Sequence, residues 1–204
     1  MLDGIMRRAL NPGLNQAGLV LAKRGVHANH ITLIGLVLGL VSAGLIAVGV
    51  AGWIAMAPLL ASRLADGLDG AVARASSITD FGGYLDIVCD FMFYGAIPLA
   101  FVLREPSING VAGAFLLTSF YANGASFLSF AILAEKRGLQ TDVQGVKSLY
   151  FSAGLLEGTE TIVLFAIICL WPALFVPLAW VFGTLCFVTA LSRTALAWRV
   201  FGKQ

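Results

Sequence analysis

The chain has 204 residues, of which 59% are hydrophobic and 12% are charged, and its mean hydropathy is +0.90. Soluble domains carry about 25% charged residues, so this composition excludes a soluble globular protein and predicts an integral membrane protein. A net charge of +2 gives no sign of a nucleic-acid partner, and we expect none. The three cysteines form no CxxC motif and lie in apolar segments, which indicates small buried residues.

The first 24 residues combine apolar and basic side chains and precede any long hydrophobic run. This pattern predicts an amphipathic helix at the membrane interface, interrupted near Asn11-Pro12-Gly13. A flexible tail is the alternative. There is no short apolar core followed by a cleavage site, so we expect the N-terminus to be retained.

Six hydrophobic segments follow, each long enough to cross a membrane: residues 31–50, 53–77, 80–103, 109–134, 149–170 and 173–198. The predicted fold is therefore an all-α membrane protein, a single domain over 1–204, with six transmembrane helices preceded by the interfacial helix. Gly35, Gly39 and Ala43 form a small-residue stripe in the first segment. Such a stripe either allows a second helix to approach closely or reflects the ordinary glycine content of membrane helices.

Basic residues concentrate on one side of this predicted topology. The opposite side holds only Arg104, whereas the first side holds Arg7, Arg8, Lys23, Arg24, Arg74, Lys136, Arg137, Lys147, Arg199 and Lys203. The positive-inside rule then places both termini at the cytoplasmic face. The aspartates of the second and third segments fall at the same face.

Four aspartates lie within these apolar segments: Asp66, Asp69, Asp86 and Asp90. A carboxylate at the centre of a membrane helix costs about 2.5–3.5 kcal/mol on insertion scales. Four unneutralised carboxylates would cost on the order of 10 kcal/mol, comparable to the stability of a whole domain. Arg63 and Arg74 are the nearby cations and cannot pair with all four, so divalent cations are expected to neutralise them.

The spacing of these residues places them on two helical faces. Asp66, Asp69, Gly70, Ala73 and Arg74 share one face of the second segment, and Asp86 and Asp90 share one face of the third. A short antiparallel turn brings the two faces together. Oxygen ligands without thiolates favour Mg²⁺ or Mn²⁺ over zinc, and a pair of ions can hold a phosphoryl group in in-line displacement.

Other residues of the same region suit a phosphate ligand. Gly70, Gly82 and Gly83 would let the ligand approach the backbone, and Arg74 offers a planar, two-pronged hydrogen-bond donor. Thr79 or Asp80 is expected to cap the third helix and not to bind the ligand.

The stretch D66-x2-D69-G70-x2-A73-R74…G82-x3-D86-x3-D90 resembles the motif of class-I CDP-alcohol phosphotransferases, DxxDGxxAR, eight residues, then GxxxDxxxD. Only seven residues separate Arg74 from Gly82, which leaves open whether Gly82 or Gly83 contacts the nucleotide. The layout of six spans after an amphipathic helix is also similar to that family, so the resemblance covers almost the whole chain.

The resemblance implies a reaction and roles for the motif residues. A CDP-lipid such as CDP-diacylglycerol would bind through its diphosphate, an alcohol would attack the β-phosphate, and CMP would leave. Asp66, Asp69 and Asp86 would bind Mg²⁺ or Mn²⁺, with two ions expected. Asp90 would ligate or adjoin the second ion and serve as the base.

Further residues are implied around the nucleotide, and a location is implied with them. Gly70, Ala73, Arg74 and Gly82 would lie along the CDP moiety. Asn29 and Thr32 resemble the polar start of the family's first helix, although a helix cap and a satisfied hydroxyl explain them equally well. Ser62 would donate a hydrogen bond to a residue that itself binds the ligand, or would bond back to its own helix. The family also suggests a homodimer in the bacterial inner membrane.

Glu157 and Glu160 are two carboxylates one turn apart in the fifth segment. They are expected either to shape the pocket of the acceptor alcohol, together with Arg63 and Lys147, or to pair with Lys147, Arg63 or Arg193 and hold the helices in register. His27 and His30 lie at the interface and are not included in the predicted site.

Three other functions fit parts of the pattern. An aminoalcohol phosphotransferase would use CDP-choline or CDP-ethanolamine with diacylglycerol as acceptor. A divalent-cation transporter would use the carboxylates but would be expected to show broken helices or internal repeats, and neither is evident. A relative that binds CDP-lipids without catalysis is the third, and the intact Asp90 argues against it.

Overall fold

The computed structural model describes residues 3–138, 156 and 158–202, and the described residues form helices joined by short connections, without a β-strand. The helices are α1 (Asp3–Lys23), α2 (Ala28–Ala47), α3 (Gly52–Ala75), α4 (Asp80–Arg104), α5 (Pro106–Lys136), α7 (Gly158–Leu170) and α8 (Phe175–Phe201), with a 3-10 turn, η1 (Pro172–Leu174), before α8. The prediction of an all-α protein is confirmed.

Four of the described helical segments are long and apolar enough to cross a membrane: α2, α4, α5 and the combined η1–α8 segment. Helix α3 has 24 residues, but it carries four charged side chains between Arg63 and Arg74. The described part of α7 has 13 residues. The structure therefore supports a membrane protein with four candidate spans among the described residues, and the layout of six spans stays a prediction.

Helix α1 is continuous from Asp3 to Lys23, so the predicted interruption near Asn11-Pro12-Gly13 is wrong. Proline removes one backbone N–H and leaves the Arg8 carbonyl without its helical partner, but its fixed φ is compatible with a helix. Pro12 lies on the exposed side of α1, where polar molecules can reach that carbonyl. On its other side α1 crosses α3, with Gly18 directly over Ala71. Its position at a membrane interface stays a prediction.

Helix α2 packs along both α3 and α4, and its small-residue stripe makes this contact. A Cβ added to Gly35 would lie 3.3 Å from the Ala65 Cβ, and one added to Gly39 would lie 2.5 Å from the Phe93 ring. Gly35, Gly39 and Ala43 are all buried. The stripe therefore permits close helix packing, as one of the two sequence interpretations predicted.

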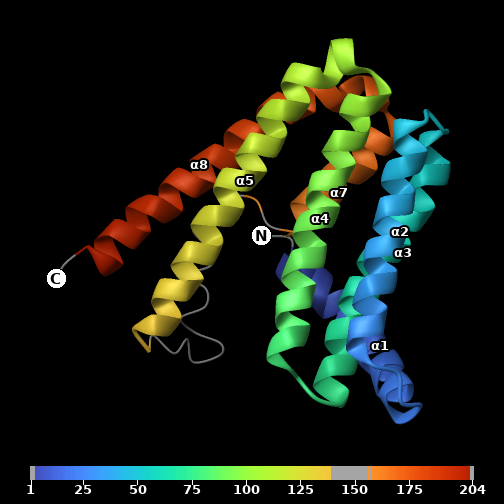
Figure 1. Ribbon diagram of the computed structural model, residues 1–204, viewed down its shortest axis with the longest axis vertical. Coiled ribbons are helices and arrows are strands. Elements are labelled where there is room, and N and C mark those ends of the chain that lie inside the picture. Colours follow the sequence, from blue (N-terminus) through green and yellow to red (C-terminus); the bar gives the residue numbers. More distant parts are fainter. Residues whose placement is uncertain (1–2, 139–155, 157, 203–204) are drawn as a thin grey trace.

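Helices α3 and α4 both pack against α2 and are joined by the short segment 76–79; α3 runs antiparallel to α2, and α4 runs parallel to it (Figure 1). Thr79 caps α4, since its side-chain oxygen accepts a hydrogen bond of 3.0 Å from the backbone N–H of Gly82. This confirms Thr79 as one of the two predicted caps. The turn brings the end of α3 and the beginning of α4 to the same end of the molecule.

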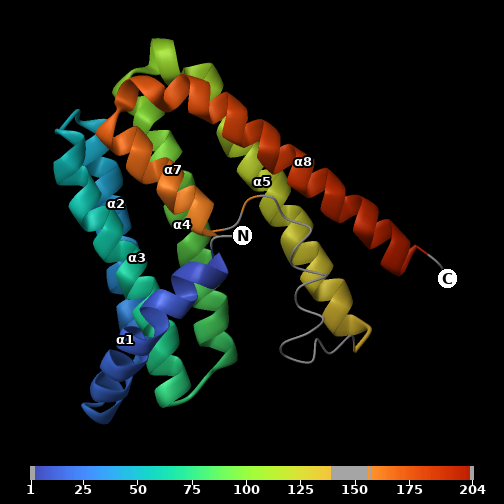
Figure 2. The same ribbon diagram turned by 180° about the vertical axis from the view of Figure 1, so that it is seen from behind.

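Helices α5 and α8 run side by side and form a second group that diverges from α2, α3 and α4 toward the end that carries α1 (Figures 1 and 2). The two groups meet at the opposite end, where α4 turns directly into α5. Buried aromatic side chains fill this junction, among them Phe101 and Phe175, whose rings stack with centroids 4.9 Å apart. The polar ends of α3 and α4 lie away from this apolar core.

Candidate functional site

The four aspartates occupy the second half of α3 and the first half of α4, at the end of the molecule where these helices are joined. Asp66 and Asp69 lie on α3, and Asp86 and Asp90 lie on α4. Each is close enough to at least one carboxylate of the other helix for their charges to interact. The helical periodicity of both segments therefore brings the aspartates onto facing surfaces, as the spacing predicts.

Arg63 contacts two of the carboxylates of this site, those of Asp66 and Asp90. Its Nη1 donates a hydrogen bond of 2.8 Å to Asp90 Oδ1 and lies 3.7 Å from Asp66 Oδ1. The guanidinium carbon stands 3.7 Å from the centre of the Phe93 ring, and Nη2 donates to the Ser62 hydroxyl oxygen at 3.2 Å. The side chain is only 9% exposed, so this guanidinium is a fixed part of the site.

Asp69 is the most deeply buried of the four aspartates, with 4% of its surface exposed. Its Oδ2 has no hydrogen-bond partner among the described residues. Thr32 of α2 is close enough to interact with the same carboxylate, and its hydroxyl also lies 3.2 Å from the Ala28 carbonyl. A buried carboxylate oxygen without a donor is unusual and indicates a ligand that supplies positive charge.

The donor set fits a hard divalent cation in its chemistry. It offers carboxylate oxygens without thiolates, one of them unsatisfied, and two of the carboxylates already hold a cationic guanidinium. Within the described residues, no three carboxylate, imidazole or thiolate side chains stand close enough together to bind one ion. The side chains thus provide the ligand types, and the metal itself stays a proposal.

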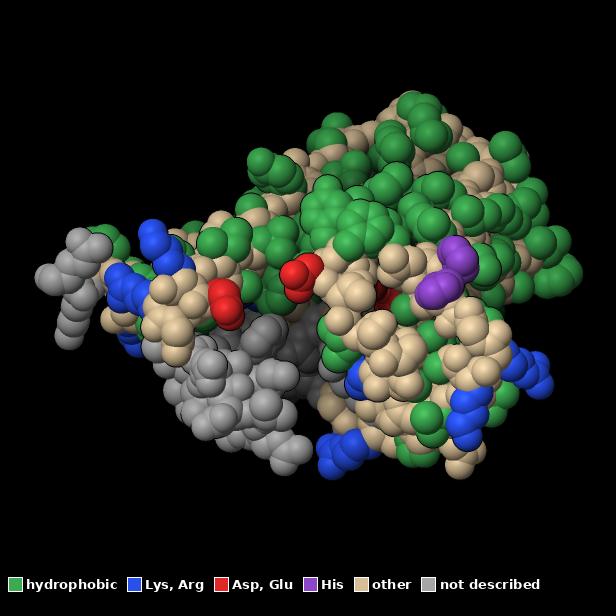
Figure 3. Space-filling model, turned by 60° about the horizontal axis from the view of Figure 1, so that its bottom comes forward, with side chains coloured by type: hydrophobic (Ala, Val, Ile, Leu, Met, Phe, Trp, Pro, Cys, Tyr) green, Lys and Arg blue, Asp and Glu red, His purple; other side chains and the backbone are tan. Residues whose placement is uncertain are grey.

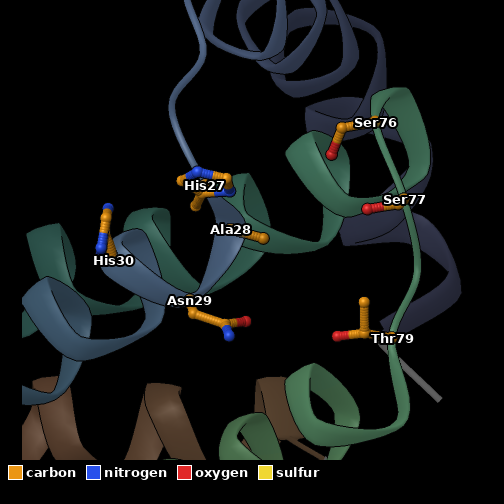
Figure 4. A pocket seen from close by; sticks show the side chains of 7 residues that line it. All are labelled: His27, Ala28, Asn29, His30, Ser76, Ser77 and Thr79. Atoms are coloured by element: carbon orange, nitrogen blue, oxygen red, sulfur yellow. The ribbon is translucent and has the colours of Figure 1, made fainter.

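A polar cavity of about 190 Å³ opens beside this site, between the start of α2 and the α3–α4 turn (Figure 4). It is lined by His27, Ala28, Asn29, His30, Ser76, Ser77 and Thr79. In Figure 4 the Asn29 side chain points toward Thr79 across the cavity. A Cβ on Gly82 would lie 3.0 Å from Thr79 Oγ1 and 3.2 Å from Asn29 Oδ1, so Gly82 lies against two of the lining residues.

The structure brings Gly82 close to Asn29, which lines this cavity, and places Thr32 about one helical turn further along α2, beside Asp69. Asn29 is not the cap of α2, because His27 holds the N-cap position. Sequence reasoning missed the contribution of His27 and His30, and of the serines Ser76 and Ser77. The signal that could have indicated these lining residues is the occurrence of two histidines and two serines at the edges of apolar segments.

Arg74 lies at the exposed end of α3 and folds over Gly70. A Cβ on Gly70 would lie 3.2 Å from Arg74 Nη1, and Arg74 Nη2 donates a hydrogen bond of 3.2 Å to Asn15 Oδ1 of α1. Ala73 is half-buried on the same helix. Helix α1 therefore reaches the motif through Asn15, a contact that spans 59 residues of sequence and that the spacing of the motif does not reveal.

The remaining predicted residues lie in different surroundings. Ser62 donates a hydrogen bond of 2.7 Å to the Gly35 carbonyl of α2, so it joins two helices and does not bond back to its own. Glu160 is half-buried in the first turn of α7. Glu157 and Lys147 lie outside the described residues. Arg193 of α8 bonds to Asn123 and Ser126 of α5, with Nη1 2.7 Å from Ser126 Oγ.

The described helices and side chains are those of a helical membrane protein with an acidic site at one end of its bundle. Residues 25–198 match the family described as CDP-alcohol phosphatidyltransferase. The chain is also similar to inner membrane protein YnjF of Escherichia coli (strain K12), with 44% identity over 195 residues that cover 95% of this chain and 93% of that protein. The chain therefore belongs to the CDP-alcohol phosphatidyltransferase family, whose members are phosphotransferases of phospholipid biosynthesis. The resemblance read from the Asp66–Asp90 motif is confirmed.

Proposed function

We propose that this protein transfers a phosphatidyl group from CDP-diacylglycerol to an alcohol acceptor and releases CMP. The observation that carries the proposal is the pair of facing helices, α3 and α4, which set four aspartates of the family motif against one another beside a polar cavity. Membership of the family supplies the CDP-alcohol substrate class.

The CDP moiety is assigned to the region between the start of α2, the end of α3 and the start of α4. Asn29 lines the cavity, Gly82 lies against Asn29, and Thr32 lies beside Asp69. Gly70, Ala73 and Arg74 lie along the adjoining face of α3. The Arg74 guanidinium suits a phosphate oxygen, because its planar donors match two acceptor atoms at once.

Asp66, Asp69 and Asp86 are the residues that would hold Mg²⁺ or Mn²⁺, with Asp90 adjoining a second ion. When bound, these ions would neutralise the diphosphate and polarise the phosphoryl group under attack. The carboxylates are held in place by two helices, α3 and α4, and their partial burial limits the access of water to the reacting phosphate. Both features favour transfer to the alcohol over hydrolysis.

Asp90 is the proposed general base. An alcohol is a poor nucleophile near pH 7, so a carboxylate that accepts its proton assists the attack. The alcohol oxygen forms a bond to the phosphorus that carries diacylglycerol, the proton passes to Asp90, and the bond to the CMP phosphate breaks. CMP leaves with the electron pair of that bond.

The acceptor is assigned to the side of the site that faces α7, where Glu160 is half-buried. The sequence also assigns Glu157, Arg63 and Lys147 to the pocket of the acceptor alcohol. Carboxylates in an apolar segment favour a neutral polyol or a cationic head group over an anionic one. The chain is proposed to work as a homodimer in the bacterial inner membrane, the location that the name of the E. coli relative gives for that protein.

The site is proposed to face the cytoplasm. Figure 3 shows the end of the molecule that carries the α3–α4 turn, with Lys and Arg side chains along its edge and hydrophobic side chains over the neighbouring surface. Exposed basic residues of this kind lie at the ends of α1, α3, α5 and α8. Their concentration supports a cytoplasmic position by the positive-inside rule.

The test is a reaction of the purified protein in mixed micelles with CDP-diacylglycerol and a panel of alcohols. The proposal expects release of CMP and a new phospholipid, identified by mass spectrometry, with one or a few of the alcohols and only with Mg²⁺ or Mn²⁺ present. Product from CDP-choline or CDP-ethanolamine and diacylglycerol alone would establish the aminoalcohol reaction instead. Divalent-cation flux into proteoliposomes without CMP release would establish the transporter.

A further inference from the structure

Arg63 lies outside the family motif, yet it contacts two of the motif's carboxylates. The same nitrogen, Nη1, is 2.8 Å from Asp90 Oδ1 and 3.7 Å from Asp66 Oδ1. Asp66 lies on α3 and Asp90 on α4, so one guanidinium links the two helices that carry the site. Arg74, the other arginine of α3, makes no ion pair with a carboxylate in the described part of the chain and bonds to Asn15 instead.

The contacts that hold Arg63 are of two kinds. The first kind does not involve the carboxylates: the guanidinium stacks on the Phe93 ring, with its central carbon 3.7 Å from the ring centre, and it donates a hydrogen bond to Ser62. Its contacts with Asp66 and Asp90 use oxygens that the proposed function assigns to a divalent cation. The Nε–H is buried and has no partner among the described residues, so the guanidinium does not occupy a position that satisfies all of its donors.

A divalent cation and Arg63 therefore compete for the same carboxylate oxygens. A cation at this site needs several oxygen ligands within a short distance and repels a guanidinium placed between them. Without a metal, the same carboxylates need another source of positive charge, because facing like charges in a half-buried site destabilise the fold. Arg63 supplies that charge.

We infer that Arg63 is an internal counter-ion: it pairs with Asp66 and Asp90 in the metal-free protein and is displaced from them when a divalent cation binds. This inference rests on the proposed function, since it takes the metal site as given. Phe93 and Ser62 retain the displaced guanidinium beside the site, because neither contact depends on the carboxylates. Arg63 is thus a positioning residue that stabilises the empty site and weakens its affinity for metal.

The experiment measures Mn²⁺ binding to the purified protein in detergent, by electron paramagnetic resonance of the free ion, together with thermal unfolding in a chelator and in Mn²⁺. Arg63→Gln removes the positive charge and is expected to bind Mn²⁺ more tightly by about tenfold or more. Its unfolding temperature should fall in chelator and recover in Mn²⁺. Arg63→Lys loses the stacking but keeps the charge, so its affinity should rise less, by about threefold.

Arg104→Gln is the matched control, because it removes the same charge from the last turn of α4, at the end of the molecule opposite the four aspartates. Its Mn²⁺ affinity should stay near the wild-type value. Equal or weaker Mn²⁺ binding by Arg63→Gln, with stability lost equally in chelator and in Mn²⁺, would show a purely structural arginine and overturn the inference. If Arg63→Gln cannot be purified, an unchanged or weaker affinity of Arg63→Lys overturns it.

The outcome also separates this inference from the proposed reaction. Tighter Mn²⁺ binding by the Arg63 variants without any CMP release by the wild-type protein would support the counter-ion and contradict the transferase. No Mn²⁺ binding by the wild-type protein or any variant would contradict the metal site, and the inference with it.

Discussion

Ser42 donates its hydroxyl to the Ala55 carbonyl at 2.7 Å, and Asn109 donates its amide to the Phe101 carbonyl at the same distance. Buried side-chain polar atoms of the described residues are satisfied in this way with two exceptions, Arg63 Nε and Asp69 Oδ2. Unsatisfied buried polar atoms are costly, about 1–3 kcal/mol each. Both exceptions lie at the carboxylate site.

The role of Asp90 as the base gives the first prediction. Asp90→Asn keeps the side-chain shape and leaves three motif aspartates, so Mn²⁺ binding should persist. Transfer should fall by roughly 10²–10⁴-fold, the usual contribution of a general base. CMP release from CDP-diacylglycerol measures the rate, and Mn²⁺ titration measures the site.

Asp80→Asn is the control for this substitution, because Asp80 lies exposed in the first turn of the same helix. Its turnover should stay close to that of the wild-type protein. If Asp90→Asn retained more than a few per cent of wild-type turnover, the base would have to be another residue.

Glu160 gives the second prediction, because it is half-buried in the first turn of α7 and outside the nucleotide motif. Glu160→Gln should lower kcat/KM for the acceptor by about ten- to a hundredfold, since a hydrogen bond to a charged group contributes roughly 1.5–3 kcal/mol. The KM for CDP-diacylglycerol should stay nearly unchanged. Steady-state kinetics with each substrate varied in turn makes the comparison.

Glu135→Gln, an exposed position at the end of α5, is the neutral control for Glu160. A folded Glu160→Gln variant with unaltered acceptor kinetics but a lower unfolding temperature would assign Glu160 to helix pairing, the other interpretation of the sequence.

At the scale of secondary structure, the ends of most helices follow from the sequence because polar or glycine residues interrupt each apolar run. Helix α4 was expected over 80–103 and ends at Arg104, and α3 was expected over 53–77 and ends at Ala75. The interruption predicted at Pro12 is wrong, since the fixed φ of proline is compatible with a helix, and α3 and α4 likewise continue through Pro58 and Pro98. Contacts such as Arg63 with Asp90 could not be predicted, because they depend on the rotation of two helices against each other.

The packing of α1 on α3 gives the third prediction. A Cβ at Gly18 would lie 2.8 Å from both the backbone carbon and the Cβ of Ala71, too close for either to remain in place. Gly18→Ala should therefore destabilise the protein by about 1–3 kcal/mol, the usual cost of overpacking. Thermal unfolding in detergent, followed by size-exclusion chromatography, measures the change.

Gly13→Ala is the control on the same helix, because nothing lies within 4 Å of a Cβ at that position. Alanine is the better helix former by roughly 0.5–1 kcal/mol, so this variant should be slightly more stable than the wild-type protein. Equal effects of the two substitutions would mean that α1 does not dock on α3.

At the scale of the whole molecule, apolar packing and chemistry occupy opposite ends. The aromatic core around Phe101 and Phe175 lies where α4 passes into α5, and the aspartates and the polar cavity lie toward the α3–α4 turn (Figure 1). Figure 3 shows Lys and Arg side chains at the end of the molecule that carries the α3–α4 turn. A diphosphate is anionic, so surrounding basic residues would raise its local concentration at the site.

This asymmetry predicts the orientation in the membrane. Cys89, Cys169 and Cys186 are buried, so a cysteine introduced at an exposed position is the accessible thiol of the described chain. Ser77→Cys, in the α3–α4 turn, should react with a membrane-impermeant maleimide only after spheroplasts are permeabilised.

Val48→Cys provides the opposite case, because Val48 is 77% exposed in the connection at the other end of α2. It should react in intact spheroplasts, and the unmodified protein should react under neither condition. The positive-inside rule requires this pattern, since basic side chains resist transfer across the membrane and gather on the side of Ser77. Labelling of Ser77→Cys but not Val48→Cys in intact cells would place the aspartates outside, away from cytoplasmic CDP-lipid head groups, and would contradict the proposed reaction.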